Sequence, residues 1–112
     1  MKRGEIYFAN LDPTIGSEIN KKRPVLVISN NANNRTSSTI TVLPITSNVK
    51  KVYSFEVLLD EKEMGLKKIS KVQCQQIRTI SKLRMNSPLV GKVDAKTLRH
   101  IENALKLHLD LS

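Results

Sequence analysis

The chain has 112 residues, which suits one domain spanning residues 1–112. Hydrophobic residues make up 39%, near the globular norm, and no stretch approaches the ~18 apolar residues that a membrane-spanning helix needs, so we expect a soluble protein. An excess of 19 Lys and Arg over 10 Asp and Glu gives a formal net charge of +9. This charge favours an anionic partner such as nucleic acid, an acidic protein or a phospholipid surface, although ordinary basic domains also carry solvated lysines.

The first residues of the chain indicate its cellular compartment, and its cysteine content indicates whether a metal site is expected. The basic start Met1-Lys2-Arg3 precedes an apolar run, residues 6–9, that is too short for a signal peptide, so we expect a cytoplasmic protein. Cys74 is the one cysteine, and it has no Cys or His neighbours at metal-ligand spacing. We therefore expect Cys74 to be a small core residue and expect neither a metal nor another cofactor.

Short apolar and β-branched runs recur along the chain and predict a mainly β protein. The predicted strands are residues 5–8, 25–29, 39–44, 55–59, 69–73 and 76–80. Turn-rich segments at 12–16, 30–38, 47–54 and 64–65 separate them, and such short links favour antiparallel pairing. Val25 to Ile28 is apolar at every position, which places this strand centrally in a strongly curved sheet or small barrel.

Two helices are predicted in the second half of the chain. Asp60 can cap and Gly65 can terminate a short helix over residues 60–64. Asp94 is a good N-cap for a C-terminal helix that packs on the sheet. The apolar stripe of that helix consists of Leu98, Ile101, Leu105 and Leu109.

Arg23 stands before Pro24 at the start of the central strand. Because a proline ring disfavours the α region for the preceding residue, Arg23 is predicted to be extended and to leave the loop in a restricted direction. Its guanidinium fork matches the oxygens of a phosphate. The ordinary alternative is a surface arginine beside a strand, paired with Glu18.

Thr46 follows a second apolar strand and opens the polar segment Thr46-Ser47-Asn48. A hydroxyl at a strand end can hydrogen-bond a phosphate oxygen or a departing 5′ oxygen. The ordinary alternative is a strand terminator that makes a local backbone bond. Arg23 and Thr46 carry more weight together, because both lie at ends of interior strands and would converge if those ends face the same side.

Other polar residues are ambiguous from the sequence alone. Lysines flank the two positions and could gather the phosphates of a nucleic acid, an interaction that added salt weakens, or could be ordinary solvated side chains: Lys21, Lys22, Lys50 and Lys51. Residues 30–38 are rich in Asn and Ser, and a plain connecting loop explains them as well as a binding segment does. His100 and His108 fall in the C-terminal helix, which indicates helix-surface residues rather than a two-histidine ribonuclease site.

Several sequence blocks occur in the order typical of a known group of proteins. They are Arg3-Gly4-Glu5-Ile6-Tyr7, Leu11-Asp12-Pro13, Gly16-Ser17-Glu18, Arg23-Pro24-Val25-Leu26-Val27-Ile28, Pro44-Ile45-Thr46 and Gln76-Ile77-Arg78-Thr79-Ile80. Together they resemble the MazF/PemK family of bacterial toxins, small ribonucleases that cut single-stranded RNA. The resemblance implies a compact SH3-like or CcdB-like β barrel with a C-terminal helix, and a homodimer with RNA in a groove across its interface.

The same resemblance implies roles for individual residues. Arg23 and Thr46 match the family's catalytic pair, Glu18 lies in the loop beside the active site, and Gln76 lies near the substrate groove. The expected substrate-binding residues are Glu18, Lys21, Lys22, Ser47, Lys50 and Gln76. Lys21 and Lys22 stand where many relatives have small or flexible residues, a difference that bears on loop mobility and cleavage specificity.

The reaction that the resemblance implies needs no metal. The ribose 2′ hydroxyl attacks the adjacent phosphorus, giving a 2′,3′-cyclic phosphate and a free 5′ hydroxyl, so DNA is not cut. A guanidinium stays protonated at neutral pH, which makes Arg23 better suited to stabilising a dianionic phosphorane than to acting as a base. Thr46 would orient the phosphate or relay a proton, and Glu18 is the nearest candidate base by sequence.

These observations predict a sequence-specific endoribonuclease toxin that is dimeric, cytoplasmic and neutralised by an acidic antitoxin. One alternative is a CcdB-like toxin on the same barrel that poisons DNA gyrase. A second is a non-catalytic RNA-binding barrel, which would bind RNA without producing new 5′ hydroxyl ends.

Overall fold

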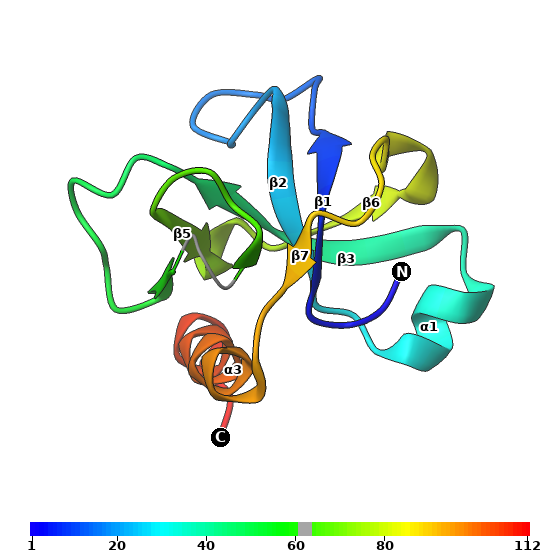
Figure 1. Cartoon of the computed structure of the whole chain (residues 1–112). Coiled ribbons are helices and arrows are strands. Elements are labelled where there is room, and N and C mark those ends of the chain that lie inside the picture. Colours follow the sequence, from blue (N-terminus) through cyan, green and yellow to red (C-terminus); the bar gives the residue numbers. More distant parts are fainter. Residues whose placement is uncertain (61–63) are drawn as a thin grey trace.

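The computed structural model describes residues 1–60 and 64–112 (Figure 1). In chain order the elements are β1 (Glu5–Asn10), β2 (Lys22–Val27), α1 (Asn31–Thr36), β3 (Thr39–Thr46), β4 (Glu56–Leu59), β5 (Ser70–Gln73), the 3-10 turn η1 (Cys74–Gln76), β6 (Arg78–Ser81), the 3-10 turn η2 (Lys82–Arg84), β7 (Gly91–Lys92) and α3 (Ala95–Leu109). Among the residues described, no helix is long and apolar enough to cross a membrane.

The strands form one antiparallel sheet in the order β4-β5-β3-β2-β1-β7, and β6 pairs with β3 off this path. The long strand β3 changes neighbours along its length. Its first half, residues 39–42, pairs with β6, whereas its last two residues, Ile45 and Thr46, pair with β5. Because the neighbours change, the sheet curves around a core and forms a half-barrel with β4 and β7 at its ends (Figure 1). The prediction of a mainly β, strongly curved fold is confirmed.

Strand β2 lies between β1 and β3, and both of its faces are covered. Val25, Leu26 and Val27 are completely buried. Leu26 packs into a cluster with residues of α3, and Val25 and Val27 pack into a second cluster on the opposite face. Each such side chain contributes about 1.5–3 kcal/mol through burial, which explains why an uninterrupted apolar run marks the centre of the sheet.

Helix α3 covers one end of the sheet, beside β4 and η1 (Figure 1). Asp94 caps it as predicted, accepting a hydrogen bond from the Thr97 amide at 2.7 Å. Ile101 is fully buried, whereas Leu109 at the end of the predicted stripe is 46% exposed because the helix has passed the edge of the core there. His100 and His108 are exposed, as predicted for surface residues of this helix.

The segment 30–38 contains a helix rather than only a connecting loop. Helix α1 begins after Asn30, whose side chain accepts from the Asn33 amide at 2.8 Å. Asn34 is buried at 4% exposure, and its side-chain amide donates to the Ser29 carbonyl at 2.8 Å. Polar capping and local side-chain hydrogen bonds therefore hold this helix, and such contacts produce no apolar periodicity in the sequence.

Other boundaries also differ from the sequence expectations. Strand β2 begins at Lys22, three residues earlier than predicted, because pairing with β1 extends to Asn10. Gln76 belongs to η1, so β6 begins only at Arg78, and the short strand β7 was not predicted. The helix predicted over residues 60–64 rests on residues 61–63, which lie outside the described residues. Cys74 is buried in the core as expected, and burial raises the pKa of its thiol to about 12.

Candidate active site

The pairing of β2 with β3 brings Arg23 and Thr46 together. Val25 pairs with Pro44 and Val27 with Val42, and the same register continued two residues further places Arg23 opposite Thr46. Both side chains line one cleft of about 210 Å³. Two residues that are distant along the chain therefore share a cleft at the ends of neighbouring strands, so the condition under which they would converge is met.

The guanidinium of Arg23 is held by one hydrogen bond. Its Nε donates to the Asn20 carbonyl at 2.7 Å, which fixes the side chain against the end of the loop between β1 and β2. Within the described residues, its terminal amino groups make no hydrogen bond, and the predicted alternative of a pair with Glu18 is not observed. Glu18 instead accepts from the Ile15 amide at 2.6 Å. The half-buried Arg23 thus keeps its donor fork available for an anion.

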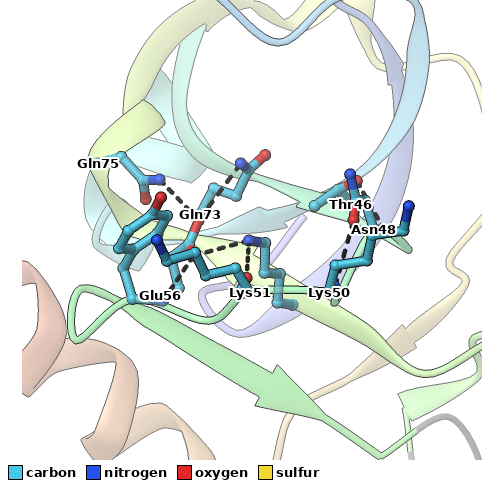
Figure 2. A network of polar contacts seen from close by, with 9 residues as sticks. Thr46, Asn48, Lys50, Lys51, Glu56, Gln73 and Gln75 are labelled. Atoms are coloured by element: carbon cyan, nitrogen blue, oxygen red, sulfur yellow. Dashed lines mark hydrogen bonds and ion pairs between the residues drawn. The ribbon is translucent and has the colours of Figure 1, made fainter.

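Thr46 is 9% exposed and makes the local backbone bond that was its ordinary alternative. Its Oγ1 accepts from the Asn48 amide at 3.2 Å, and Asn48 Oδ1 accepts from the Lys50 amide at 3.4 Å (Figure 2). A hydroxyl that accepts one hydrogen bond still has its own proton to donate. The local bond therefore orients Thr46 without using up its donor.

Gln76 lines the same cleft and ties the β1–β2 loop to η1. Its Oε1 accepts from the Ile19 amide at 3.3 Å, and its Nε2 donates to the Ser17 carbonyl at 3.4 Å. The side chain predicted to lie near the substrate groove therefore also positions the wall of the cleft.

The base of the same loop is held by hydrogen bonds from arginines of β6 and η2. Arg78 Nη1 donates to the Leu11 carbonyl at 3.0 Å, and Arg84 Nη1 donates to the carbonyls of Asn10 and Asp12. The Leu11 amide donates to the Lys21 carbonyl at 3.0 Å, where Lys21 turns the chain with a φ of 69°. The backbone of Lys21 thus shapes the turn that leads into β2 and Arg23.

The remaining predicted binding residues are spread over two environments. Lys22 and Ser47 line a second cavity, of about 420 Å³, which Arg23 also lines. Glu18, Lys21 and Lys50 are exposed and line neither cavity of the described structure. Among the described residues that line the Arg23–Thr46 cleft there is no carboxylate or imidazole, so Glu18 does not lie where a base in that cleft would.

A buried polar network next to Thr46 was not predicted. Lys71, which pairs with Thr46 across β3 and β5, donates through Nζ to Glu56 Oε1 at 2.8 Å and to the Lys51 carbonyl at 2.6 Å. Gln75 donates to the other Glu56 oxygen at 2.8 Å (Figure 2). The available sequence signal was one acidic and one basic residue on two neighbouring predicted strands.

The network fixes the charge on Glu56. Burial raises the pKa of this carboxyl, but hydrogen bonds from Lys71, the Tyr53 amide and Gln75 outweigh burial and hold the pKa below its ordinary value. Lys71 also lines the cleft of Arg23 and Thr46. The ion pair therefore anchors the 47–54 segment at Lys51 and Tyr53, beside the cleft.

Comparison with known proteins identifies the family. The sequence profile of the PemK-like, MazF-like toxins of type II toxin–antitoxin systems matches residues 2–109. The chain is 47% identical over 116 residues to endoribonuclease MazF9 of Mycobacterium tuberculosis, covering 99% of this chain and 98% of that protein. It is 38% identical over 112 residues to endoribonuclease EndoA of Bacillus subtilis, covering 99% and 96%.

Solved structures agree on the fold. A crystal structure of MazF from Deinococcus radiodurans superposes with a TM-score of 0.87 at 24% identity, covering 99% of this chain and 97% of that one. A mycobacterial endoribonuclease in complex with its cognate antitoxin superposes with a TM-score of 0.82 at 24% identity, covering 100% and 97%. The fold implied by the sequence resemblance is thereby confirmed. The chain belongs to the PemK-like, MazF-like toxin family.

Proposed function

We propose that this protein is a sequence-specific, metal-independent endoribonuclease toxin that cleaves single-stranded mRNA in the cytoplasm, with one domain spanning residues 1–112. One observation carries the proposal: Arg23 and Thr46 line the same cleft in a chain 47% identical to a protein named as an endoribonuclease. The geometry favours catalysis over RNA binding alone, because an oriented guanidinium and an oriented hydroxyl suit charge development at phosphorus.

In the proposed reaction the scissile phosphate lies between the two side chains. Arg23 holds the non-bridging oxygens and stabilises the dianionic phosphorane that forms when the ribose 2′ oxygen attacks. Thr46, oriented by the Asn48 amide, donates a hydrogen bond to a phosphate oxygen, or relays the proton released by the attacking 2′ hydroxyl to the leaving 5′ oxygen. The products are a 2′,3′-cyclic phosphate and a 5′ hydroxyl.

The substrate and regulatory partners follow from the charge and the relatives. A net charge of +9 attracts RNA and also an acidic antitoxin. The mycobacterial endoribonuclease described above binds its cognate antitoxin, and we propose that a homodimer of this chain is restrained in the same way. An acidic segment bound over the cleft would compete directly with the substrate phosphates.

The test is to map RNA 5′ ends after incubating a transcript pool with the purified protein in the presence of EDTA. We expect new 5′ hydroxyl ends at one recurring sequence, and no cutting of the matching DNA. The variant Arg23→Ala should lose this cleavage. Arg35→Ala, which changes an exposed arginine on α1, is its matched control and should still cleave. Absence of new ends with the wild-type protein would leave only a binding function.

A further inference from the structure

The second cavity that Arg23 lines, about 420 Å³ in volume, has the size of a small-ligand site. Its walls are mainly apolar and come from separate parts of the chain: Phe8, Pro24, Ile45, Leu66 and Val90. Its charged lining residues are all basic: Lys22, Arg23, Lys67 and Lys68. An apolar interior with a wholly basic charged lining suits a ligand that has a flat apolar part attached to an anion.

One wall of this cavity is fixed by close backbone packing. A Cβ on Gly65 would lie 2.2 Å from the Val90 carbonyl oxygen, and a Cβ on Gly91 would lie 2.0 Å from the Met64 carbonyl oxygen. Gly65 also has a φ of +74°, which other residues rarely adopt. The Val90 amide in turn donates to the Ile6 carbonyl of β1 at 2.9 Å. The segment that carries Leu66 is therefore held directly against the sheet, and the cavity is preformed.

The aromatic ring in the cavity has a suitable setting for stacking. Phe8 is half-buried on β1, and Lys22 Nζ lies 5.9 Å from its ring centroid. Proteins bind splayed bases by stacking them on such rings, and each stacked base contributes about 1–3 kcal/mol. With few aromatic residues in the chain, a single base pocket fits better than an extended stacking surface.

We propose that this cavity is a subsite for the base of a nucleotide adjacent to the scissile phosphate, with Phe8 stacking on the base. This inference rests on the proposed function, because Arg23 belongs to both cavities and so fixes the spacing between the cut phosphate and the base. Lys67 and Lys68, which are exposed at the cavity, contact the phosphate beyond that base.

The test asks whether removing the Phe8 ring and removing one base of the RNA affect the same contact. Short RNAs that contain the mapped cleavage sequence receive a single abasic substitution at each position flanking the cut. We expect one position to lower kcat/KM of the wild type about 10-fold or more. Phe8→Leu keeps apolar bulk but removes the ring, and we expect it to lower kcat/KM on intact RNA by a similar factor. The same abasic substitution should then lower kcat/KM of the Phe8→Leu variant by less than about twofold.

Controls separate this subsite from general damage. Leu83→Ala, at a position 93% exposed and outside the cavity, should behave as the wild type. Leu66→Ala changes another wall residue and replaces Phe8→Leu if the latter does not fold, as judged by circular dichroism. If every abasic substitution lowers kcat/KM of the folded variant by the same factor as that of the wild type, the proposed subsite is wrong, although the proposed cleavage activity is unaffected.

A binding readout keeps the subsite testable if the protein cuts no RNA and the proposed function fails. An all-2′-deoxy oligonucleotide containing 2-aminopurine reports base stacking through fluorescence quenching. Quenching by the wild type that is lost in Phe8→Leu would support a base site without catalysis. Equal quenching by both proteins, or none by either, would overturn it.

Discussion

The Lys71 ammonium lies 2.8 Å from a carboxylate oxygen of Glu56, and the two side chains are 9% and 1% exposed. Lys71 is also the cross-strand partner of Thr46. A buried ion pair thus stands directly beside the strand end that carries the proposed catalytic hydroxyl. The Lys71 ammonium also donates to the Lys51 carbonyl, and this hydrogen bond fixes the segment that follows Thr46.

Removing one member of this pair should destabilise the protein strongly. Lys71→Met leaves the Glu56 carboxylate buried without its counter-charge, and we expect a loss of roughly 3–5 kcal/mol in the free energy of unfolding. Urea denaturation followed by circular dichroism measures this loss. The double variant Lys71→Met/Glu56→Leu removes both charges and should recover part of the stability. A double variant at least as unstable as the sum of the two single variants would contradict the assignment of the loss to an uncompensated charge.

The ion pair also predicts that the free energy of unfolding falls at acid pH. The pKa of Glu56 is lower in the folded protein than its ordinary value of 4.5, so the unfolded state binds a proton first as pH falls. The stability contributed by this group is complete above pH 4.5 and is lost as pH falls through the folded pKa. Glu56→Gln should therefore be less stable than the wild type near pH 7, with a difference that narrows below pH 4.5. A constant difference across that range would exclude Glu56 as the source.

Thr46 offers a conservative test of the hydroxyl. Thr46→Ser keeps the donor and the bond from the Asn48 amide, and we expect it to retain cleavage within about 10-fold. Thr46→Ala removes both and should lower kcat about 10²–10³-fold, the usual cost of one preorganised donor. Single-turnover cleavage of the mapped RNA separates this loss from weaker binding. Equal activity of the two variants would show that the hydroxyl takes no part.

Gln76 should act through the loop. Gln76→Ala removes two long hydrogen bonds, at 3.3 and 3.4 Å, so the unfolding free energy should change by only about 1 kcal/mol. Hydrogen exchange of the amides at residues 15–20 should become faster, while that of β2 stays unchanged. Unaltered exchange in the loop would mean that other contacts hold the tip.

The sequence predicted the parts of the fold that depend on apolar patterning. The unbroken run at Val25–Ile28 marked the central strand, and the spacing of Ile101 and Leu105 marked the buried face of α3. Helix α1 was missed because Asn34 holds it through side-chain hydrogen bonds, which leave no periodic signal. Patterning thus locates elements that bury apolar surface and misses those that polar contacts hold.

The site was predictable only in part, for a related reason. Residue types at strand ends suggested Arg23 and Thr46, but their juxtaposition depends on the β2–β3 register, which no local signal specifies. The pairing of Glu56 with Lys71 depends in the same way on the register of β4 and β5. Lys22 and Ser47 line the second cavity rather than the cleft of Thr46, and Arg23 lines both.

The most direct test of the central claim is the single-turnover rate at which Arg23→Ala cleaves an RNA carrying the mapped sequence. We expect the variant to fold with the circular dichroism spectrum and unfolding midpoint of the wild type and to cleave about 10²–10³-fold more slowly, with Arg35→Ala unchanged. A correctly folded Arg23→Ala protein that cuts this RNA at the wild-type rate would contradict the account.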